Sequence, residues 1–143
     1  MGTHIGATPK QIADDIAKAS NKTYTTYVKN GIKRYVWSYT SDGTFKTPNY
    51  GPTCDILVVA GGGGGGAWNN RSGGGGGAGG YRTASGHTVT PQGYTVVVGS
   101  GGAGGDQTSG TKGSDSVFDT ITATGGGNPV SYTHLTLPTN REV

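Results

Sequence analysis

Contiguous glycines constrain this chain more than any other feature of its sequence. Residues 61–66 and 73–77 are all glycine, and residues 99–105 form a third glycine-rich stretch. Glycine accounts for 30 of the 143 residues, about three times its usual share of roughly 7%. Only 31% of the residues are hydrophobic and 13% are charged, which is too little apolar mass for a compact α/β enzyme and too little charge for a typical disordered tail. An ordinary enzyme core is therefore not expected.

Each glycine block follows a segment with the composition of a β-strand. Residues 55–60, 94–98 and 116–124 are rich in β-branched residues, and each leads into glycines. The continuous apolar run at 55–60 predicts a strand that is buried on both faces. Two shorter β-signals lie at residues 81–84 and 88–90. We predict a mainly β fold, with a compact antiparallel β-sandwich-like domain at residues 39–128 that carries long polyglycine loops.

Three common glycine motifs do not fit this pattern. A collagen triple helix needs glycine at every third position with abundant proline, and only 6 prolines are present. A phosphate-binding P-loop is excluded because Lys112 lacks the preceding strand and glycine loop at the required distance. Gly99, Gly101 and Gly104 match a dinucleotide fingerprint, but the polar residues that follow form no helix to face a pyrophosphate. No cofactor is expected.

A flexible linker and an ordered lattice remain as interpretations of the glycine runs. Each ordered glycine costs about 0.5–1 kcal/mol more than alanine would, so an ordered structure requires compensation. Extended polyproline-II-like runs have no internal hydrogen bonds, and they could bond to neighbouring runs in a lattice that only glycine allows. Several copies of the chain could also share such a lattice.

Residues 1–38 precede the glycine-rich part and predict a helix followed by a β-hairpin. Thr8 and Pro9 have the pattern of an N-cap and a first helical residue, and the helix should end near Ser20. Such a short helix must dock on another part of the protein or on a neighbouring chain. Two Thr-, Tyr- and Val-rich runs flank the type I′ turn pair Asn30 and Gly31. This register places Tyr27 opposite Arg34 and Tyr24 opposite Trp37.

The C-terminal segment has a different origin from the rest of the chain in our interpretation. Residues 130–139 read Val-Ser-Tyr-Thr-His-Leu-Thr-Leu-Pro-Thr, which resembles the in-frame translation of a sequencing-library adapter. We therefore assign residues 129–143 to a non-native, adapter-derived tail and leave them out of the fold prediction. The alternative is a genuine short β-segment.

Several motifs follow one another in a definite order along the glycine-rich part. The motifs are Tyr-Thr-Ser-Asp-Gly-Thr-Phe at 39–45, Ile-Leu-Val-Val-Ala before six glycines at 56–66, and Tyr-Thr-Val-Val-Val-Gly-Ser-Gly-Gly-Ala-Gly-Gly at 94–105. In this order they resemble the glycine-rich domain of tail fibres and receptor-binding tail proteins of tailed bacteriophages. The resemblance implies a compact β-structure with projecting glycine loops, carried at the distal end of a fibre or tail tip.

The resemblance also implies a contact site, because related glycine-rich adhesins use polyglycine segments to frame loops that touch the host surface. The framed residues here are Trp68, Asn69, Asn70, Arg71, Tyr81 and Arg82. An aromatic ring can stack on the apolar face of a sugar while amide and guanidinium groups donate hydrogen bonds. Alternatively, Trp68 is a buried anchor for its loop. Residues 106–112 are polar without aromatics, which is typical of a spacer.

The resulting expectation is a non-catalytic structural and host-recognition component of the virion, made in the host cytoplasm. Its expected partners are a cell-surface carbohydrate or outer-membrane protein, other phage tail proteins and further copies of the chain. No catalytic or metal-binding residue is assigned, because His87 and Cys54 lack companions at usable spacing. The net charge of +3 is scattered, so nucleic acid is not an expected partner. A bacterial glycine-rich surface adhesin is the alternative.

Overall fold

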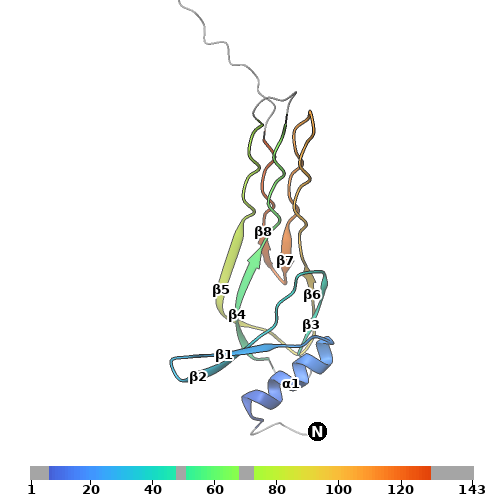
Figure 1. The fold of residues 1–143 in the computed structure, drawn as a ribbon. Helices are drawn as coiled ribbons and strands as arrows, with labels where there is room; N and C mark the ends of the chain where they lie inside the picture. Colours follow the sequence, from blue (N-terminus) through green and yellow to red (C-terminus); the bar gives the residue numbers. More distant parts are fainter. Residues whose placement is uncertain (1–6, 48–50, 68–72, 130–143) are drawn as a thin grey trace, which may run out of the picture.

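The computed structural model describes residues 7–47, 51–67 and 73–129, and its fold is mainly β (Figure 1). One helix precedes a series of antiparallel strands, which confirms the predicted fold class. The elements are α1 (Pro9–Ser20), β1 (Thr25–Lys29), β2 (Ile32–Val36), β3 (Gly43–Lys46), β4 (Thr53–Val59), β5 (Tyr81–Thr88), β6 (Gly93–Val97), β7 (Ser116–Phe118) and β8 (Ile121–Ala123).

Helix α1 begins and ends where the sequence predicts. The side chain of Thr8 accepts a hydrogen bond from the backbone N–H of Gln11, and Asn21 closes the helix in the left-handed conformation. Ala13 and Ile16 are buried, and Ile16 belongs to the main hydrophobic core. The helix therefore docks on the β-domain of its own chain, as a helix of this length must do to be stable.

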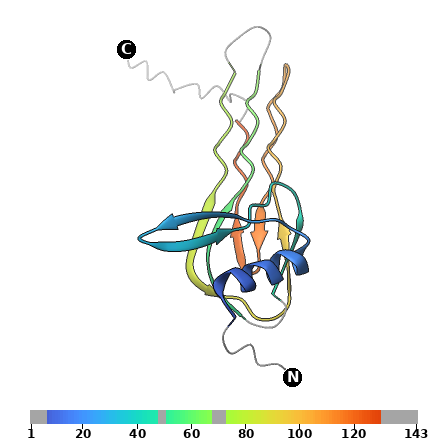
Figure 2. The same cartoon turned by 60° about the horizontal axis from the view of Figure 1, so that its bottom comes forward.

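The hairpin formed by β1 and β2 also has the predicted register, with Tyr27 opposite Arg34. The rings of Tyr24 and Trp37 lie 5.5 Å apart, which confirms the second predicted pair. The cation–π contacts in this region join Lys33 to Tyr35 and Lys22 to Tyr39. The hairpin crosses in front of the sheets (Figure 2), and every residue of β1 is exposed.

The remaining strands form a four-stranded sheet, in the order β3-β6-β7-β8, and a two-stranded sheet of β4 and β5. Three strand predictions were wrong. The first of the two signals at 81–84 and 88–90 lies in β5, which continues to Thr88 and so includes only the first residue of the second signal; β5 has an irregularity opposite residues 54–56 of β4. The predicted strand at 116–124 is a tight hairpin of β7 and β8, since Asp119 adopts the left-handed conformation between them.

Strand β4 was predicted to be buried on both faces, and this was the third error. Val58 is buried, whereas Leu57 and Val59 are 65% and 55% exposed. One face of β4 packs against Ala123 and Ile121 of β8, and the other face has no covering layer in the described residues. The continuous apolar run of β4 is therefore buried on one face and exposed on the other.

The hydrophobic core lies between α1 and the sheets. Its buried members are Ile16, Phe45, Val89, Tyr94 and Val96. A second cluster of Val58, Ala60 and Ala123 lies closer to the glycines, and Phe118 packs against both clusters. The aromatic ring of Phe118 thus connects the helix-covered end of the domain to the end from which the glycine runs emerge.

Extended glycine-rich runs project from the sheets on the side away from α1 (Figure 1). We call residues 61–67, 73–80, 99–105, 108–114 and 124–127 the first to fifth runs and all five together the glycine bundle. None of them has helix or strand assignment, yet all are joined by backbone hydrogen bonds between runs.

The first run lies at the centre of the glycine bundle and bonds to all four others. Residues of the first run that are three positions apart bond to the same neighbouring run. Gly61 and Gly64 donate to the carbonyls of Ser114 and Thr111 in the fourth run, at 3.0 and 2.9 Å. Gly63 and Gly66 donate in the same way to the second run. A three-residue period is the repeat of a polyproline-II-like helix. The bonds confirm the predicted lattice and exclude the flexible-linker interpretation for these residues.

Close packing explains why the runs contain glycine at particular positions. In the third run, a Cβ at Gly99, Gly102 or Gly105 would collide with a carbonyl oxygen of the fourth run, whereas Gly101 and Gly104 have no neighbour closer than 3.7 Å. Ser100 and Ala103 occupy the outward positions. Glycine is therefore required only where the backbones of two runs approach each other.

We expect backbone hydrogen exchange to reveal this order. The amides of Gly63, Gly64 and Gly77 each donate to a carbonyl of another run, so they should exchange much more slowly than amides of an unstructured chain. A two-dimensional NMR exchange experiment measures each glycine amide separately. Exchange at the random-coil rate in all three would contradict the lattice.

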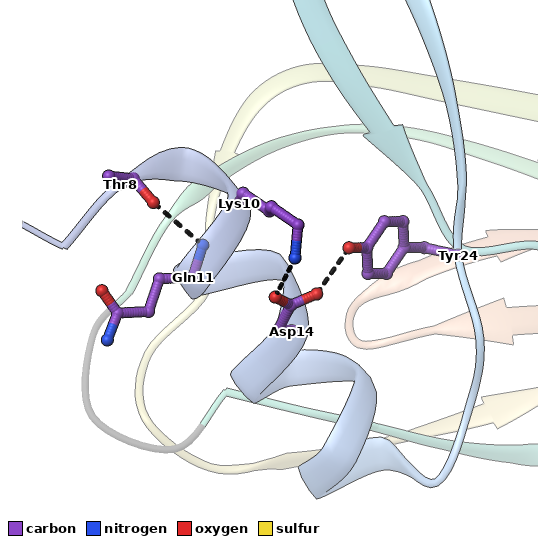
Figure 3. Close-up of polar contacts among 5 residues, drawn as sticks. All are labelled: Thr8, Lys10, Gln11, Asp14 and Tyr24. Carbon is purple, nitrogen blue, oxygen red and sulfur yellow. Dashed lines mark hydrogen bonds and ion pairs between the residues drawn. The ribbon is translucent and has the colours of Figure 1, made fainter.

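A second prediction concerns the exposed polar contacts that join α1 to the segment before β1 (Figure 3). Asp14 accepts hydrogen bonds from Lys10 at 2.6 Å and from the Tyr24 hydroxyl at 2.5 Å. The bond from Lys10, followed by that from Tyr24, lowers the pKa of the Asp14 carboxyl. A lowered folded-state pKa stabilises the fold above the unfolded pKa, and this stabilisation is lost as the pH falls through the folded value.

Asp14→Asn should therefore reduce Tm slightly at neutral pH, and the difference from the wild type should vanish in acid below the folded pKa of Asp14. The effect is small because the contacts are solvent-exposed. Thermal unfolding followed by circular dichroism over this pH range measures it. An equal difference at every pH would show that the charge of Asp14 has no role in stability.

Candidate functional site

The end of the glycine bundle farthest from α1 brings three runs together. The N–H of Gly66 donates to the carbonyl of Gly74 at 2.9 Å, and the N–H of Ala67 donates to the carbonyl of Thr108 at 3.2 Å. A seven-residue polyproline-II-like run rises about 20 Å, so this end lies about that far from the strands. We call Ala67, Gly73 and residues 105–109 the distal tip.

Exposed polar groups of the distal tip come from residues 106–108. Asp106, Gln107 and Thr108 are exposed, and Gln107 adopts the left-handed conformation that turns the chain from the third run into the fourth. Residues 106–112 were predicted to be a spacer. Residues 106–108 form an exposed turn, whereas Thr111 belongs to the lattice, since it donates to Ala103 and accepts from Gly64. The overlooked signal is the three-residue spacing of Gly110 and Gly113, which is the period of the lattice.

The six predicted contact residues fall into two groups. Trp68, Asn69, Asn70 and Arg71 lie outside the described residues, between Ala67 and Gly73 of the distal tip. Tyr81 and Arg82 begin β5, where the amide of Gly80 donates to the carbonyl of Thr124 at 2.8 Å.

The second run separates the two groups. Tyr81 and Arg82 therefore lie at the base of the glycine bundle, one full run away from the distal tip. Both are exposed, Tyr81 at 69%, and they pair with Val59 and Val58 of β4. The structure does not bring Tyr81 and Arg82 to the distal tip.

The candidate reactive side chains make structural contacts. His87 of β5 lies 3.0 Å from the carboxylate of Asp119 in the β7–β8 turn, which links the two sheets. Burial raises the pKa of the Cys54 thiol, which favours its protonated form. In the part of the chain that the structure describes, no three His, Cys, Asp or Glu side chains are grouped as metal ligands would be.

Membrane spanning by a helix finds no support in the same residues. The described part of the chain contains no helix with both the length and the apolar character to cross a bilayer.

An antiparallel β-domain that carries a hydrogen-bonded bundle of glycine runs defines a glycine-rich structural domain. A family model described as "Glycine-rich domain" matches residues 40–140, which is more than half of the chain. The chain therefore belongs to this glycine-rich domain family. The match also extends over residues 130–140, which were predicted to belong to an adapter-derived tail. No curated protein and no solved structure matches the chain.

Proposed function

We propose that this protein is a non-catalytic structural and host-recognition component of a bacteriophage tail, a tail-fibre or tail-tip protein that contacts the host cell with the distal tip of its glycine bundle. The observation that carries the proposal is the ordered lattice, which holds a short polar tip about 20 Å from the β-domain. The resemblance of residues 39–127 to phage tail proteins supplies the biological context.

The lattice suits recognition because its hydrogen bonds hold the distal tip at a fixed distance from the β-domain. Each run bonds to its neighbours at every third residue, so the turn at residues 106–108 is anchored at both ends. A preorganised loop loses less conformational entropy on binding than a free one does. Loop residues can also vary freely, because the lattice depends on backbone groups and not on their side chains.

The proposed ligand is a cell-surface carbohydrate or a loop of an outer-membrane protein. Gln107 and Thr108 supply amide and hydroxyl groups that can bond sugar hydroxyls or backbone groups. Trp68 and Arg71 would add an aromatic surface and a cation, and their placement lies outside the described residues. Other tail proteins and further copies of the chain are the proposed partners in a virion.

Cell-binding assays with purified protein test the proposal, provided that the panel of bacterial strains includes a host. Wild-type protein should bind cells of some strains, and Trp68→Ala/Arg71→Ala should lose most of that binding. Tyr81→Ala/Arg82→Ala is the matched control, because it removes the same kinds of side chain from the base of the glycine bundle. We expect this control to bind as the wild type does.

Two results would overturn parts of the proposal. Equal binding by the wild type and the Trp68→Ala/Arg71→Ala variant would exclude these residues as the contact site. Loss of binding only in the Tyr81→Ala/Arg82→Ala variant would move the contact to the base of the glycine bundle. Circular dichroism of each variant must match the wild type, so that loss of fold is not scored as loss of contact.

A further inference from the structure

A large apolar groove lies at the other end of the molecule, beside the hairpin and β4. Its volume is about 680 Å³, and it is lined mainly by apolar side chains of the hairpin, α1, β4, β6 and β7. Four of the chain's exposed large hydrophobic residues line it: Tyr27, Leu57, Val59 and Val97. Large apolar side chains that remain exposed on one continuous surface mark an interaction site.

The groove follows an unpaired strand edge. All seven residues of β4 line it, although successive side chains of a strand point to opposite faces. A groove that touches both faces of a strand runs along the edge of that strand. In the described residues β4 pairs with β5 alone, so its other edge has no strand partner. Backbone N–H and C=O groups on such an edge are free to pair with an added strand.

The charged side chains that line the groove are two cations, Lys33 and Arg34, and one carboxylate, Asp55. Lys33 and Arg34 of β2 line the groove, and neither forms an ion pair within the described residues. The carboxylate of Asp55, which also lines it, accepts the backbone N–H of Gly86 at 3.1 Å. Residues 21–41 contain no acidic side chain. Two cations against one carboxylate leave the lining with a net positive charge, which favours a ligand with negative charge.

One buried donor beside the groove has no hydrogen-bond partner in the described residues. The indole N–H of Trp37, another lining residue, is buried and has no acceptor among the described residues. An unsatisfied buried donor costs about 1–3 kcal/mol. Because solvent does not reach this N–H, a ligand in the groove could bond to it only after neighbouring side chains had moved.

We propose that this groove binds an extended, acidic segment of a partner protein, which adds as a strand to the free edge of β4. The added backbone pairs with β4, its apolar side chains cover Leu57 and Val59, and its carboxylates face Lys33 and Arg34. This mode combines main-chain hydrogen bonds for affinity with side-chain contacts for specificity. The chain's own residues 1–6 contain no acidic side chain to match the two cations.

A blocked heptapeptide in which valine alternates with glutamate is the probe, and its counterpart with lysine in place of glutamate is the control. The acidic peptide should bind saturably in a fluorescence anisotropy titration, at least tenfold more tightly than the basic one. Hydrogen exchange of β4 amides should slow at least tenfold in the complex, and the indole N–H resonance of Trp37 should shift on binding.

Charge reversal separates the proposed site from general electrostatics. Lys33→Glu/Arg34→Glu should weaken acidic-peptide binding at least tenfold, since both residues are exposed and no stabilising ion pair is lost. Lys18→Glu/Lys112→Glu makes the same change in net charge at exposed residues outside the groove. This second variant should bind the peptide as the wild type does.

The proposal is overturned if the acidic peptide fails to bind, if both charge variants weaken binding equally, or if the β4 amides show no added protection. It is also overturned if the protein alone forms a dimer that Leu57→Lys disrupts, because a second copy would then be the occupant. Analytical ultracentrifugation of the wild type and Leu57→Lys distinguishes that outcome.

Discussion

Gly102→Ala should destabilise the protein by about 3 kcal/mol or more, although it adds a single methyl group. A Cβ at this position would collide with the carbonyl oxygen of Thr111, so the third and fourth runs would have to move apart. Gly102 also donates its N–H to the carbonyl of Gly62 at 2.8 Å, and the same displacement would strain this bond. Urea denaturation followed by circular dichroism measures the change.

The adjacent glycine supplies the matched control. Gly101 lies in the same run, and the nearest atom to an added Cβ is the carbonyl oxygen of Gly62 at 3.7 Å, an ordinary contact. Gly101→Ala should therefore leave stability unchanged or raise it by about 0.4–1 kcal/mol, because alanine restricts the unfolded chain. Equal effects of the two substitutions would show that the runs do not pack as closely as the lattice requires.

Phe45→Ala should cost about 3–5 kcal/mol, the usual range for removing a buried aromatic side chain. Phe45 is only 6% exposed and lies at the centre of the aromatic cluster. Its ring centroid is 5.7 Å from that of Trp37 and 5.9 Å from that of Phe118, both in edge-to-face geometry. Loss of this ring would leave a cavity between α1 and the sheets. Denaturant unfolding at constant pH provides the free energy.

Two comparisons make the Phe45 result interpretable. Tyr27→Ala removes an aromatic ring from the exposed hairpin, where half of the side-chain surface is in water, so it should change stability by less than about 1 kcal/mol. Phe45→Leu should recover much of the loss, because it keeps most of the buried apolar volume. A smaller loss for Phe45→Ala than for Tyr27→Ala would contradict the assignment of the core.

The local elements were predictable because their signals are local. A Thr-Pro pair set the start of α1, and the Asn30-Gly31 turn set the hairpin register. The wrong predictions concern features of the strands that cannot be recognised from short sequence patterns. Whether Leu57 and Val59 are covered depends on which strands lie beside β4, and the split of β7 from β8 depends on the conformation of Asp119.

The candidate site was predictable in part. The sequence indicated a loop framed by glycine runs, and the structure places Ala67 and Gly73 at the distal tip. The sequence did not reveal that residues 106–108 share this tip, because the contact between Ala67 and Thr108 joins segments about 40 positions apart. It also grouped Tyr81 and Arg82 with the loop, although a complete run separates them in space.

The sequence by itself determined that the glycines require a special backbone arrangement and that β-strands lead into them. Contiguous glycine excludes ordinary side-chain packing, and the entropy cost per residue demands compensation. Only the tertiary structure decided which backbones supply that compensation. Each hydrogen bond of the lattice joins one run to another, so no local pattern specifies which glycine faces a carbonyl and which faces solvent.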